Sequence, residues 1–308
     1  MFIVMANIIC FQLISLLIAK SYADLYDYYD DALARRMLIL SAGAYHLENP
    51  EYCITNHFGN VEMVQLYKEL CAFNYEDLCA SYMALLHDDK VIAIVFRGTV
   101  KMTQLMDESF SGFEAKERYY EIGDVNVYFN SAFRQIWVTG MSDVFDEIRQ
   151  QYPIYTVWVT GHSFGGALTS LLAPYLICKY GYNATNLALY TFGQPRVGDD
   201  DYAYSHSEMI PWFFRVVHNQ DVVAEVFPEA LGYKHHSTEV WYGADMSPGA
   251  GYTICGYNYG AVCEKPLGIP SKEDHSIYFN KFLSKYGRLN CTLPISVSKL
   301  EKLLVIDF

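Results

Sequence analysis

Short apolar runs alternate with longer helical patterns along most of this chain. Four runs are predominantly apolar and rich in β-branched or aromatic side chains: 91–96, 155–159, 187–192 and 212–217. Residues 132–150 carry apolar side chains at helical spacing, and 165–179 also reads as a helix. Runs without polar alternation are typical of strands that are buried on both faces. The order of these elements therefore predicts an α/β protein, with a mainly parallel sheet and helices on both of its faces.

The composition excludes several classes of protein. Of the 308 residues, 52% are hydrophobic and 16% aromatic, so a disordered chain is excluded, because burial of this apolar mass offsets the entropy lost on ordering. The net charge is −13, which gives no basic surface for the phosphates of a nucleic acid or for an anionic membrane. Neither an internal repeat nor a Pro-, Gly- or Ser-rich linker is present, and no obligate protein partner is evident.

The first 23 residues differ from the rest of the chain. Met1–Ala19 is almost entirely apolar, and the small residues Ser21 and Ala23 stand at −3 and −1 of a cleavage site. This pattern predicts a secretory signal peptide over residues 1–23. The alternative is an uncleaved membrane anchor, since a run of about 18 apolar residues just spans a bilayer. Asn7 and Gln12 within the run favour cleavage.

Export to an extracellular location agrees with other features of the remaining domain, residues 24–308. Asn183 and Asn290 each begin an Asn-x-Thr sequon for glycosylation. Seven cysteines remain, for which three disulfides and one free thiol is the simplest count: Cys53, Cys71, Cys79, Cys178, Cys255, Cys263 and Cys291. None of them shows the Cys-x₂-Cys spacing of a zinc site, so neither a metal nor another cofactor is expected.

A tight turn directly follows the second strand-like run. Residues 161–166 read Gly-His-Ser-Phe-Gly-Gly, a G-x-S-x-G pattern with a strand before it and a helix after it. Such a turn lifts Ser163 Oγ clear of the sheet and places it at a helix N-terminus. There the backbone N–H of Phe164 is able to donate a hydrogen bond to a developing oxyanion. Ser163 is the predicted nucleophile, and a purely structural turn is the alternative.

A serine nucleophile needs an acid and a base, which follow it in the chain in that order. The fourth strand-like run leads into Asp221, just past the predicted strand end. The competing carboxylates, Asp199–Asp201, lie beyond a Gly-Gln-Pro-Arg-Val-Gly segment and read as a solvated loop. Asp221 is therefore the predicted acid, and an exposed turn aspartate is the alternative.

The base must come from the histidines that follow Asp221. These are His235, His236 and His275. The adjacent pair lies in a Gly- and Tyr-containing stretch without an obvious partner, whereas His275 stands at the start of a predicted helix. His275 is the predicted general base. His218 and His162 are interpreted as structural, on a strand and within the turn respectively.

A second oxyanion donor is expected in the loop after an early strand. Thr99 follows the run 91–96 directly and offers both a backbone N–H and a hydroxyl. Gly98 permits close approach of the backbone to a substrate. Arg97 is interpreted as half of a buried structural ion pair below the site rather than as a substrate-binding cation.

The segment after Thr99 carries an apolar stripe at helical spacing. Its members are Met102, Leu105, Met106, Phe110 and Phe113. A short helix packed permanently on the core would show the same pattern. Because the segment grows from the oxyanion loop, we interpret it as a mobile lid that covers the site and offers methionines and phenylalanines to a lipid surface when open.

Taken together, these motifs resemble the class 3 lipases, the triacylglycerol lipases of the filamentous-fungal type, in a secreted animal or nematode-like branch. The resemblance rests on five segments in the same order: 95–99, 161–167, 191–198, Asp221 and Asp274-His275. It implies the α/β-hydrolase fold, a Ser163–Asp221–His275 triad and an oxyanion hole formed by Thr99 and Phe164.

The same resemblance implies how the cysteines pair. Cys53–Cys291 would join the N-terminal and C-terminal segments, Cys255–Cys263 would close a short loop before His275, and Cys71–Cys79 is the remaining local pair. Cys178 would then be free. Residues 292–308 extend beyond the point where members of the family tend to end, and the lid sequence differs from that of the fungal enzymes.

The implied function is a secreted serine hydrolase that cleaves carboxylic esters of lipids, with triacylglycerol the favoured substrate. A phospholipase A1, or a short-chain or feruloyl esterase, on the same fold is the alternative within the enzyme class, because the width of an acyl pocket is not readable from sequence. An inert lipid-binding or interaction protein is the alternative outside it. Such a protein is expected to lose a triad member, and this chain retains all three residues.

Overall fold

The computed structural model describes residues 29–71, 78–99, 114–236, 238–256, 263, 265 and 267–292. The predicted signal peptide and the predicted lid residues lie outside these ranges. Within them, no helix is both long enough and apolar enough to cross a membrane.

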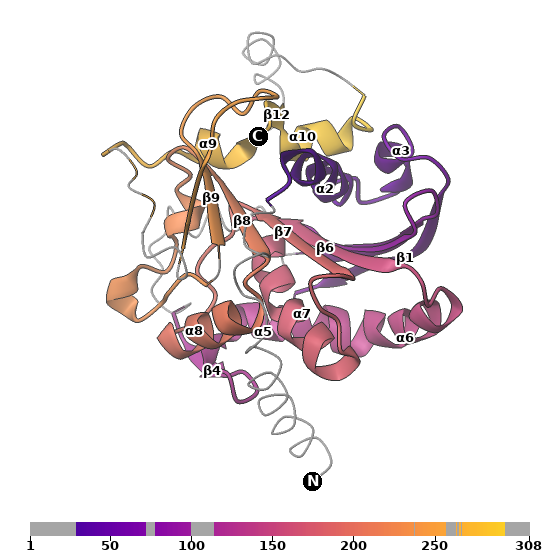
Figure 1. Cartoon of the computed structure of the whole chain (residues 1–308), viewed down its shortest axis with the longest axis horizontal. Coiled ribbons are helices and arrows are strands. Elements are labelled where there is room, and N and C mark those ends of the chain that lie inside the picture. Colours follow the sequence, from indigo (N-terminus) through magenta and orange to yellow (C-terminus); the bar gives the residue numbers. More distant parts are fainter. Residues whose placement is uncertain are drawn as a thin grey trace.

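An eight-stranded sheet forms the centre of the molecule (Figure 1). In spatial order its strands are β1 (Val61–Leu70), β2 (Leu78–Leu86), β3 (Val91–Phe96), β6 (Thr156–His162), β7 (Leu187–Phe192), β8 (Phe213–His218), β9 (Thr238–Tyr242) and β10 (Thr253–Gly256). The five strands from β3 to β9 are parallel, whereas β1, β2 and β10 pair antiparallel with their neighbours. The predicted mainly parallel sheet is therefore confirmed, and the four predicted strands are β3, β6, β7 and β8.

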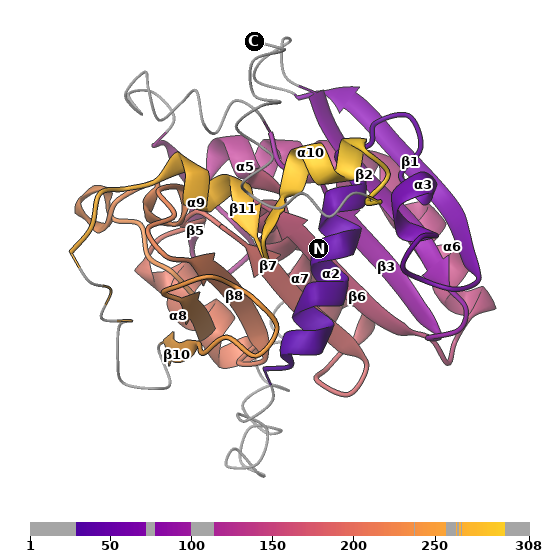
Figure 2. The ribbon, with the colours of Figure 1, turned by 90° about the horizontal axis from the view of Figure 1, so that it is seen from above.

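Helices cover both faces of the sheet, as Figures 1 and 2 show. One face carries α2 (Asp31–Gly43), α3 (Glu51–Ile54), α9 (Lys272–Ser276) and α10 (Leu283–Arg288). The other carries α5 (Val127–Phe133), α6 (Ser142–Gln151), α7 (Phe164–Tyr180) and α8 (Asp200–Met209). The remaining short elements are β4 (Lys116–Arg118) with β5 (Asp124–Asn126), β11 (Ile277–Tyr278) with β12 (Lys281–Phe282), and the 3₁₀ turns η2 (Val223–Glu225) and η3 (Glu229–Leu231).

Strand β3 shows why an apolar run is needed at the centre of this architecture. Ile92, Ile94 and Phe96 belong to one core cluster. Val91, Ala93 and Val95, which alternate with them along the strand, belong to the other. All six residues of the strand are buried. The two core clusters therefore lie on opposite faces of one sheet, which is the arrangement expected when both faces carry helices.

The predicted helices occur with one difference in detail. Helix α7 matches the predicted segment 165–179 closely. The predicted segment 132–150 is helical throughout, but its middle, Arg134–Met141, is a π-helix (η1) between α5 and α6. Apolar spacing in the sequence does not distinguish a π-helical turn from an α-helical one.

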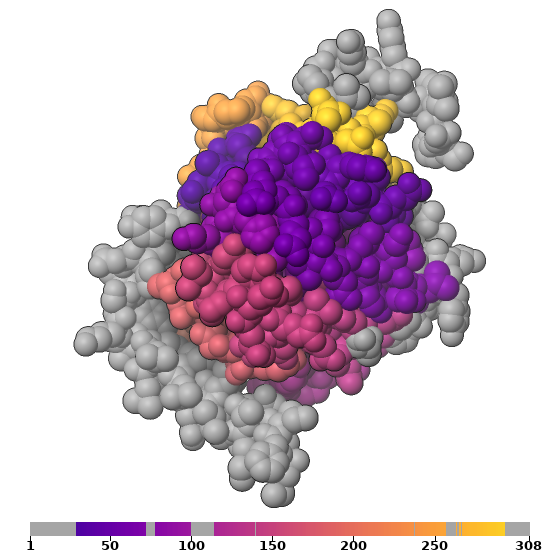
Figure 3. All heavy atoms as spheres, turned by 90° about the vertical axis from the view of Figure 1, so that its right-hand side faces the viewer, coloured from indigo at the N-terminus to yellow at the C-terminus, as the bar shows by residue number. Residues whose placement is uncertain are grey.

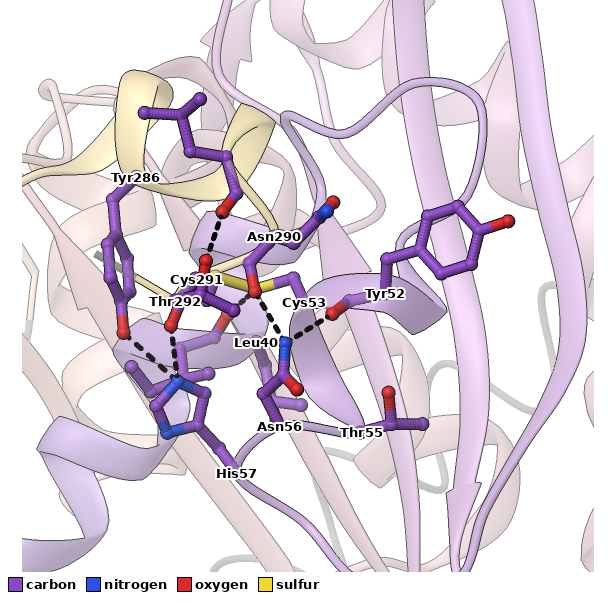
Figure 4. Close-up of a disulfide and its surroundings, with 12 residues drawn as sticks. Leu40, Tyr52, Cys53, Thr55, Asn56, His57, Tyr286, Asn290, Cys291 and Thr292 are labelled. Carbon is purple, nitrogen blue, oxygen red and sulfur yellow. Dashed lines mark hydrogen bonds between the residues drawn. A yellow bond between two sulfur atoms is a disulfide. The ribbon is translucent and has the colours of Figure 1, made fainter.

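Three disulfides join the predicted pairs, Cys53–Cys291, Cys71–Cys79 and Cys255–Cys263. Figure 4 shows that hydrogen bonds reinforce the first of them: Asn56 Nδ2 donates to the Asn290 carbonyl at 2.8 Å, and His57 Nε2 lies 2.9 Å from the Cys291 carbonyl. In Figure 3 the indigo-to-purple surface of the N-terminal segment accordingly borders the yellow C-terminal surface.

Cys178 is also disulfide-bonded, so the expectation of a free thiol at this position is wrong. Its partner lies outside the described residues.

Candidate active site

Ser163 occupies a strained turn between β6 and α7. Its backbone angles are φ 60° and ψ −127°, a region in which residues other than glycine are rare and strained by roughly 1–3 kcal/mol. The turn is held by hydrogen bonds from Ser163 N to the Phe192 carbonyl (2.8 Å) and from Gly166 N to the Ser163 carbonyl (2.9 Å). The side chain is buried, and its Oγ has no hydrogen-bond partner among the described residues. An unpaired hydroxyl on a strained turn is typical of a nucleophile.

The glycines around Ser163 are required by close packing of backbone on backbone. A Cβ at Gly161 would collide with the Gly165 carbonyl, and a Cβ at Gly165 would collide with the Phe96 carbonyl at the end of β3. The turn therefore presses against the neighbouring parallel strand. This contact brings the loop after β3, which contains Thr99, next to the nucleophile turn.

Asp221 and His275 form a buried pair. His275 Nδ1 lies 3.0 Å from both carboxylate oxygens of Asp221, and the two residues are 3% and 2% exposed respectively. The carboxylate also accepts hydrogen bonds from Val223 N (2.8 Å) and from the Tyr278 hydroxyl (2.5 Å). Because a carboxylate only accepts, His275 Nδ1 carries the hydrogen, which leaves Nε2 as the free base.

Two opposing effects act on the Asp221 carboxyl. Burial alone would raise its pKa, but the positive charge that His275 carries when protonated and hydrogen bonds from His275 and Tyr278 together hold the pKa below the ordinary value. Asp221 is therefore ionised at neutral pH. An ionised partner stabilises the imidazolium that forms when His275 accepts a proton.

Several contacts bring the Asp221–His275 pair to the nucleophile turn. The ring of His162, which directly precedes Ser163, stacks on the ring of His275 with centroids 4.5 Å apart and planes inclined by 24°. Gly193, in the loop after β7, has φ +57°, and an added Cβ there would lie 2.5 Å from Asp221 Oδ2. The loops after β3, β6, β7 and β8 thus converge with His275 at the carboxyl ends of the parallel strands, where ligands bind in α/β sheets.

The two predicted oxyanion donors lie on this same edge. Thr99 is buried and follows β3 within three residues. Phe164 is the first residue of α7, so its backbone N–H belongs to the unsatisfied first turn of that helix. A Cβ at Gly98 would lie 3.2 Å from the Cβ of Ser163, which shows how closely the two loops approach.

The competing carboxylates have other roles. Asp199 caps α8 by accepting from Tyr202 N at 2.9 Å, and the next two aspartates form the first turn of that helix. The interpretation of this triple as a solvated loop is therefore wrong. A side-chain acceptor followed by acidic residues is in fact a helix-start signal.

The competing histidines also have structural partners. His235 Nε2 lies 2.6 Å from the Ala224 carbonyl, and His236 Nε2 lies 2.7 Å from Ser170 Oγ. His218 ends β8, as expected, with Nδ1 at 3.1 Å from the Asp274 carbonyl. Arg97 donates to the Leu78 carbonyl.

Two tyrosines that touch the site were not expected from the sequence. Tyr278 contacts Asp221 as described above, and the Tyr45 hydroxyl lies 2.6 Å from His162 Nδ1. The only sequence signal for Tyr278 is its place three residues after His275. Tyr45 is 117 residues from the histidine that it contacts, so no local pattern indicates it.

The other predicted sites differ in how much of them the structure describes. The lid residues Met102 to Phe113 lie outside the described residues. At the first sequon, Asn183 Oδ1 accepts from Thr185 N at 2.9 Å and from Thr185 Oγ1 at 2.7 Å in an exposed turn. Asn290 follows α10 beside the Cys53–Cys291 disulfide. In the part of the chain that the structure describes, no group of three His, Cys, Asp or Glu side chains is arranged to hold a metal ion.

Known proteins resemble this chain in sequence and in structure. Residues 93–231 match the family described as lipase (class 3). A lipase of Caenorhabditis elegans is 31% identical over 272 residues, which cover 80% of this chain and 72% of that protein. A lipase of Rhizomucor miehei is 37% identical over 165 residues, or 52% of this chain and 44% of that protein. A triacylglycerol lipase whose structure is described as having a serine protease triad at its catalytic centre superimposes with a TM-score of 0.63 and 25% identity, covering 80% of this chain and 93% of its own.

Proposed function

We propose, from the premise that this chain belongs to the class 3 lipase family and is a carboxylic ester hydrolase with the α/β-hydrolase fold, that it cleaves fatty-acyl esters of glycerol, with triacylglycerol as the main substrate. One observation carries the proposal. The buried Asp221–His275 pair meets the strained Ser163 turn at the carboxyl edge of the parallel strands. A triad of the serine protease type is also described for the triacylglycerol lipase that superimposes on this chain.

The proposed reaction has two steps. Ser163 Oγ attacks the ester carbonyl carbon while His275 Nε2 accepts the serine proton, and Asp221 stabilises the resulting imidazolium. The tetrahedral intermediate then collapses to an acyl-enzyme, and His275 returns its proton to the departing alcohol oxygen of the glycerol. A water molecule, activated by the same histidine, releases the fatty acid and restores Ser163.

The negative oxygen of the intermediate needs hydrogen-bond donors that are already in place. We assign this role to the backbone N–H of Phe164 and to Thr99, through its N–H or its hydroxyl. Their position beside Ser163 supports the assignment. Removing one such donor typically costs a factor of about 10² to 10³ in kcat.

Secretion is part of the proposal. Three disulfides support it, because disulfides persist in oxidising compartments. Residues 1–23 would be removed, leaving 24–308 as one domain with glycans on Asn183 and Asn290. N-terminal sequencing of protein collected from the culture medium should begin at Asp24. Protein that retains the leader and stays in the membrane fraction would contradict cleavage.

The substrate class is tested by comparing three esters in a titration of released acid. Emulsified long-chain triacylglycerol should be hydrolysed fastest, with a sharp rise in rate once the ester exceeds its solubility limit if residues 102–113 act as a lid. Met106→Asp should flatten that rise and spare hydrolysis of a soluble ester. Preference for phospholipid would indicate a phospholipase A1, and activity on soluble short-chain esters alone would indicate an esterase without a functional lid. No hydrolysis of any ester would indicate a binding protein.

The catalytic assignment is tested with Ser163→Ala. Activity should fall by about 10⁴ or more while the protein remains folded, and a fluorophosphonate ester should label Ser163 in the unmodified chain. Ser205→Ala on α8 is a matched control that should leave hydrolysis unchanged. Full activity of Ser163→Ala, or labelling at another residue, would refute the assignment.

A further inference from the structure

The hydroxyl of Tyr45 lies where three segments of the site meet. Tyr45 follows the C-cap of α2, and its hydroxyl oxygen lies 2.6 Å from His162 Nδ1. The same oxygen packs closely against the backbone of Gly98, next to Thr99, because a Cβ added to Gly98 would collide with it. Burial raises the pKa of Tyr45 above its ordinary value, so the hydroxyl keeps its hydrogen at neutral pH.

The contacts of His162 define which of its nitrogens carries the hydrogen. His162 Nε2 lies 2.8 Å from the backbone carbonyl of His275. A carbonyl only accepts, so Nε2 is the donor and Nδ1 of the neutral ring is bare. The Tyr45 hydroxyl therefore donates to Nδ1 and stabilises this tautomer. Burial, and next the charge of His275, lower the pKa of His162 to about 3, so the ring stays neutral.

His162 thereby reaches the proposed base in two ways. Its N–H holds the main chain of His275, and its ring stacks against the His275 ring at 4.5 Å. Asp221 meanwhile holds His275 Nδ1 at 3.0 Å. The His275 imidazole is thus restrained at three points: through the backbone carbonyl of His275, on one face of the ring, and at Nδ1. A neutral ring on that face also avoids the repulsion that a second cation would exert when His275 accepts a proton.

The contact with Gly98 extends the restraint to the oxyanion loop. A Cβ at Gly98 would collide with the Tyr45 hydroxyl and would lie 2.9 Å from the His162 carbonyl. The hydroxyl therefore fits into a space that only glycine leaves open. Through this one oxygen, the loop that carries Thr99 is joined to the segment that carries Ser163.

We propose that Tyr45 and His162 are positioning residues for the ester hydrolysis proposed above: the Tyr45 hydroxyl fixes the His162 tautomer, and His162 in turn holds His275 in line with Ser163. The inference rests on the proposed function and adds two residues that touch neither the ester nor the proton that is transferred. Misplacement of a base by a fraction of an ångström lowers the rate of the chemical step and leaves substrate binding intact.

The test is Tyr45→Phe, which removes one oxygen atom. We expect kcat on a soluble ester to fall about tenfold, which corresponds to one neutral hydrogen bond, with KM within about twofold of wild type because substrate contacts are unchanged. The rate of fluorophosphonate labelling of Ser163 should fall by the same factor. Tyr82→Phe is the matched control: its hydroxyl donates to the Leu40 carbonyl at 2.7 Å in a fully buried setting, and its loss should lower the melting temperature without changing kcat.

A double-variant cycle separates positioning from general stability. His162→Phe keeps a ring for stacking but loses both hydrogen bonds, so we expect it to lower kcat at least as much as Tyr45→Phe does. The double variant should be no slower than His162→Phe alone, because the connection is already broken. Three results would overturn the proposal: an unchanged kcat in Tyr45→Phe, a higher KM at constant kcat, or a kcat reduction in the double variant that equals the product of the two single reductions. A wild-type chain inert toward both ester and probe would overturn the proposed function, and this inference with it.

Discussion

Acidification should destabilise this protein chiefly through four histidines that the fold shields from water. Burial lowers the pKa of His162 and of His206 to about 3. The pKa values of His235 and His236 lie well below the ordinary value, mainly because of burial and further because positive groups lie nearby. The ring centroids of His206 and His236 are 3.7 Å apart. Protonation of both rings would therefore place two positive charges in contact and destabilise the folded state.

The direction of the effect follows from proton binding. In the unfolded chain these histidines protonate near pH 6.5, whereas in the folded chain they stay neutral. The unfolded state therefore binds more protons as the pH falls below 6.5, and the free energy of unfolding falls by about 1.4 kcal/mol per pH unit for each histidine. Between pH 6.5 and 4.5 the loss is about 2.3 kcal/mol for each of His162 and His206. His235 and His236 act in the same direction. A typical domain has about 5–15 kcal/mol in total, so the folded state should lose a large share of its stability within this range.

The assay is urea unfolding followed by tryptophan fluorescence at several pH values between 7.5 and 5. His206→Gln should make the dependence of the unfolding free energy on pH shallower by about 1.4 kcal/mol per unit. Tyr202→Phe is the control, because it removes a hydroxyl 2.8 Å from Ser170 Oγ in the same cluster without removing a histidine, and it should lower stability equally at every pH. An unfolding free energy that stays constant from pH 6.5 to 5 would refute the reasoning.

Two further predictions test other parts of the structure. Gly193→Ala should lower kcat by at least about 100-fold, because the added Cβ would displace Asp221. Gly181→Ala, at φ +75° with open space around it, should cost only about 1 kcal/mol of stability, and equal kcat losses at the two positions would contradict the steric argument. Replacing Cys53 and Cys291 by serine opens a loop of 238 residues and should lower the free energy of unfolding by about 5 kcal/mol, measured in urea. Each of the other two described disulfides closes a sequence separation of 8, for which the same relation gives only about 2.5 kcal/mol. Equal losses would show that loop length does not set the stabilisation.

The central strands were predictable because their position leaves a clear pattern. A strand with helices on both sides, such as β3, is buried on both of its faces and is therefore apolar at nearly every position. Strand β1 leaves a weaker signal: its side chains are half-buried or exposed and it pairs on one side only. The π-helical turn of η1 leaves none, since it shifts hydrogen bonds by one residue without changing which side chains are apolar.

The candidate site was predictable to the extent that its chemistry depends on local sequence and chain order. The turn at Ser163 requires glycines at fixed positions, and an acid and a base must follow it. Tyr45 and Tyr278 carry no such constraint. The chain contains 27 tyrosines, and which of them reaches Asp221 or His162 depends on how distant segments pack.

The Cys53–Cys291 bond also determines how the molecule responds to mechanical tension. A force applied at residues 29 and 292 is transmitted from the sulfur of Cys53 to the sulfur of Cys291. The 238-residue loop between these two cysteines therefore bears almost none of the load. This loop contains the sheet and the residues Ser163, Asp221 and His275. Only the stretch that contains α2 and α3 is free to unravel, and it adds roughly 80 Å of extended chain. Once the bond is reduced, the same pull can draw out about 900 Å. While the bond is oxidised, the sheet and the three triad residues are therefore shielded from forces applied at residues 29 and 292, whereas Tyr45 lies in the stretch that is not shielded. A reductant changes the molecule from a body that resists stretching into one that unravels completely.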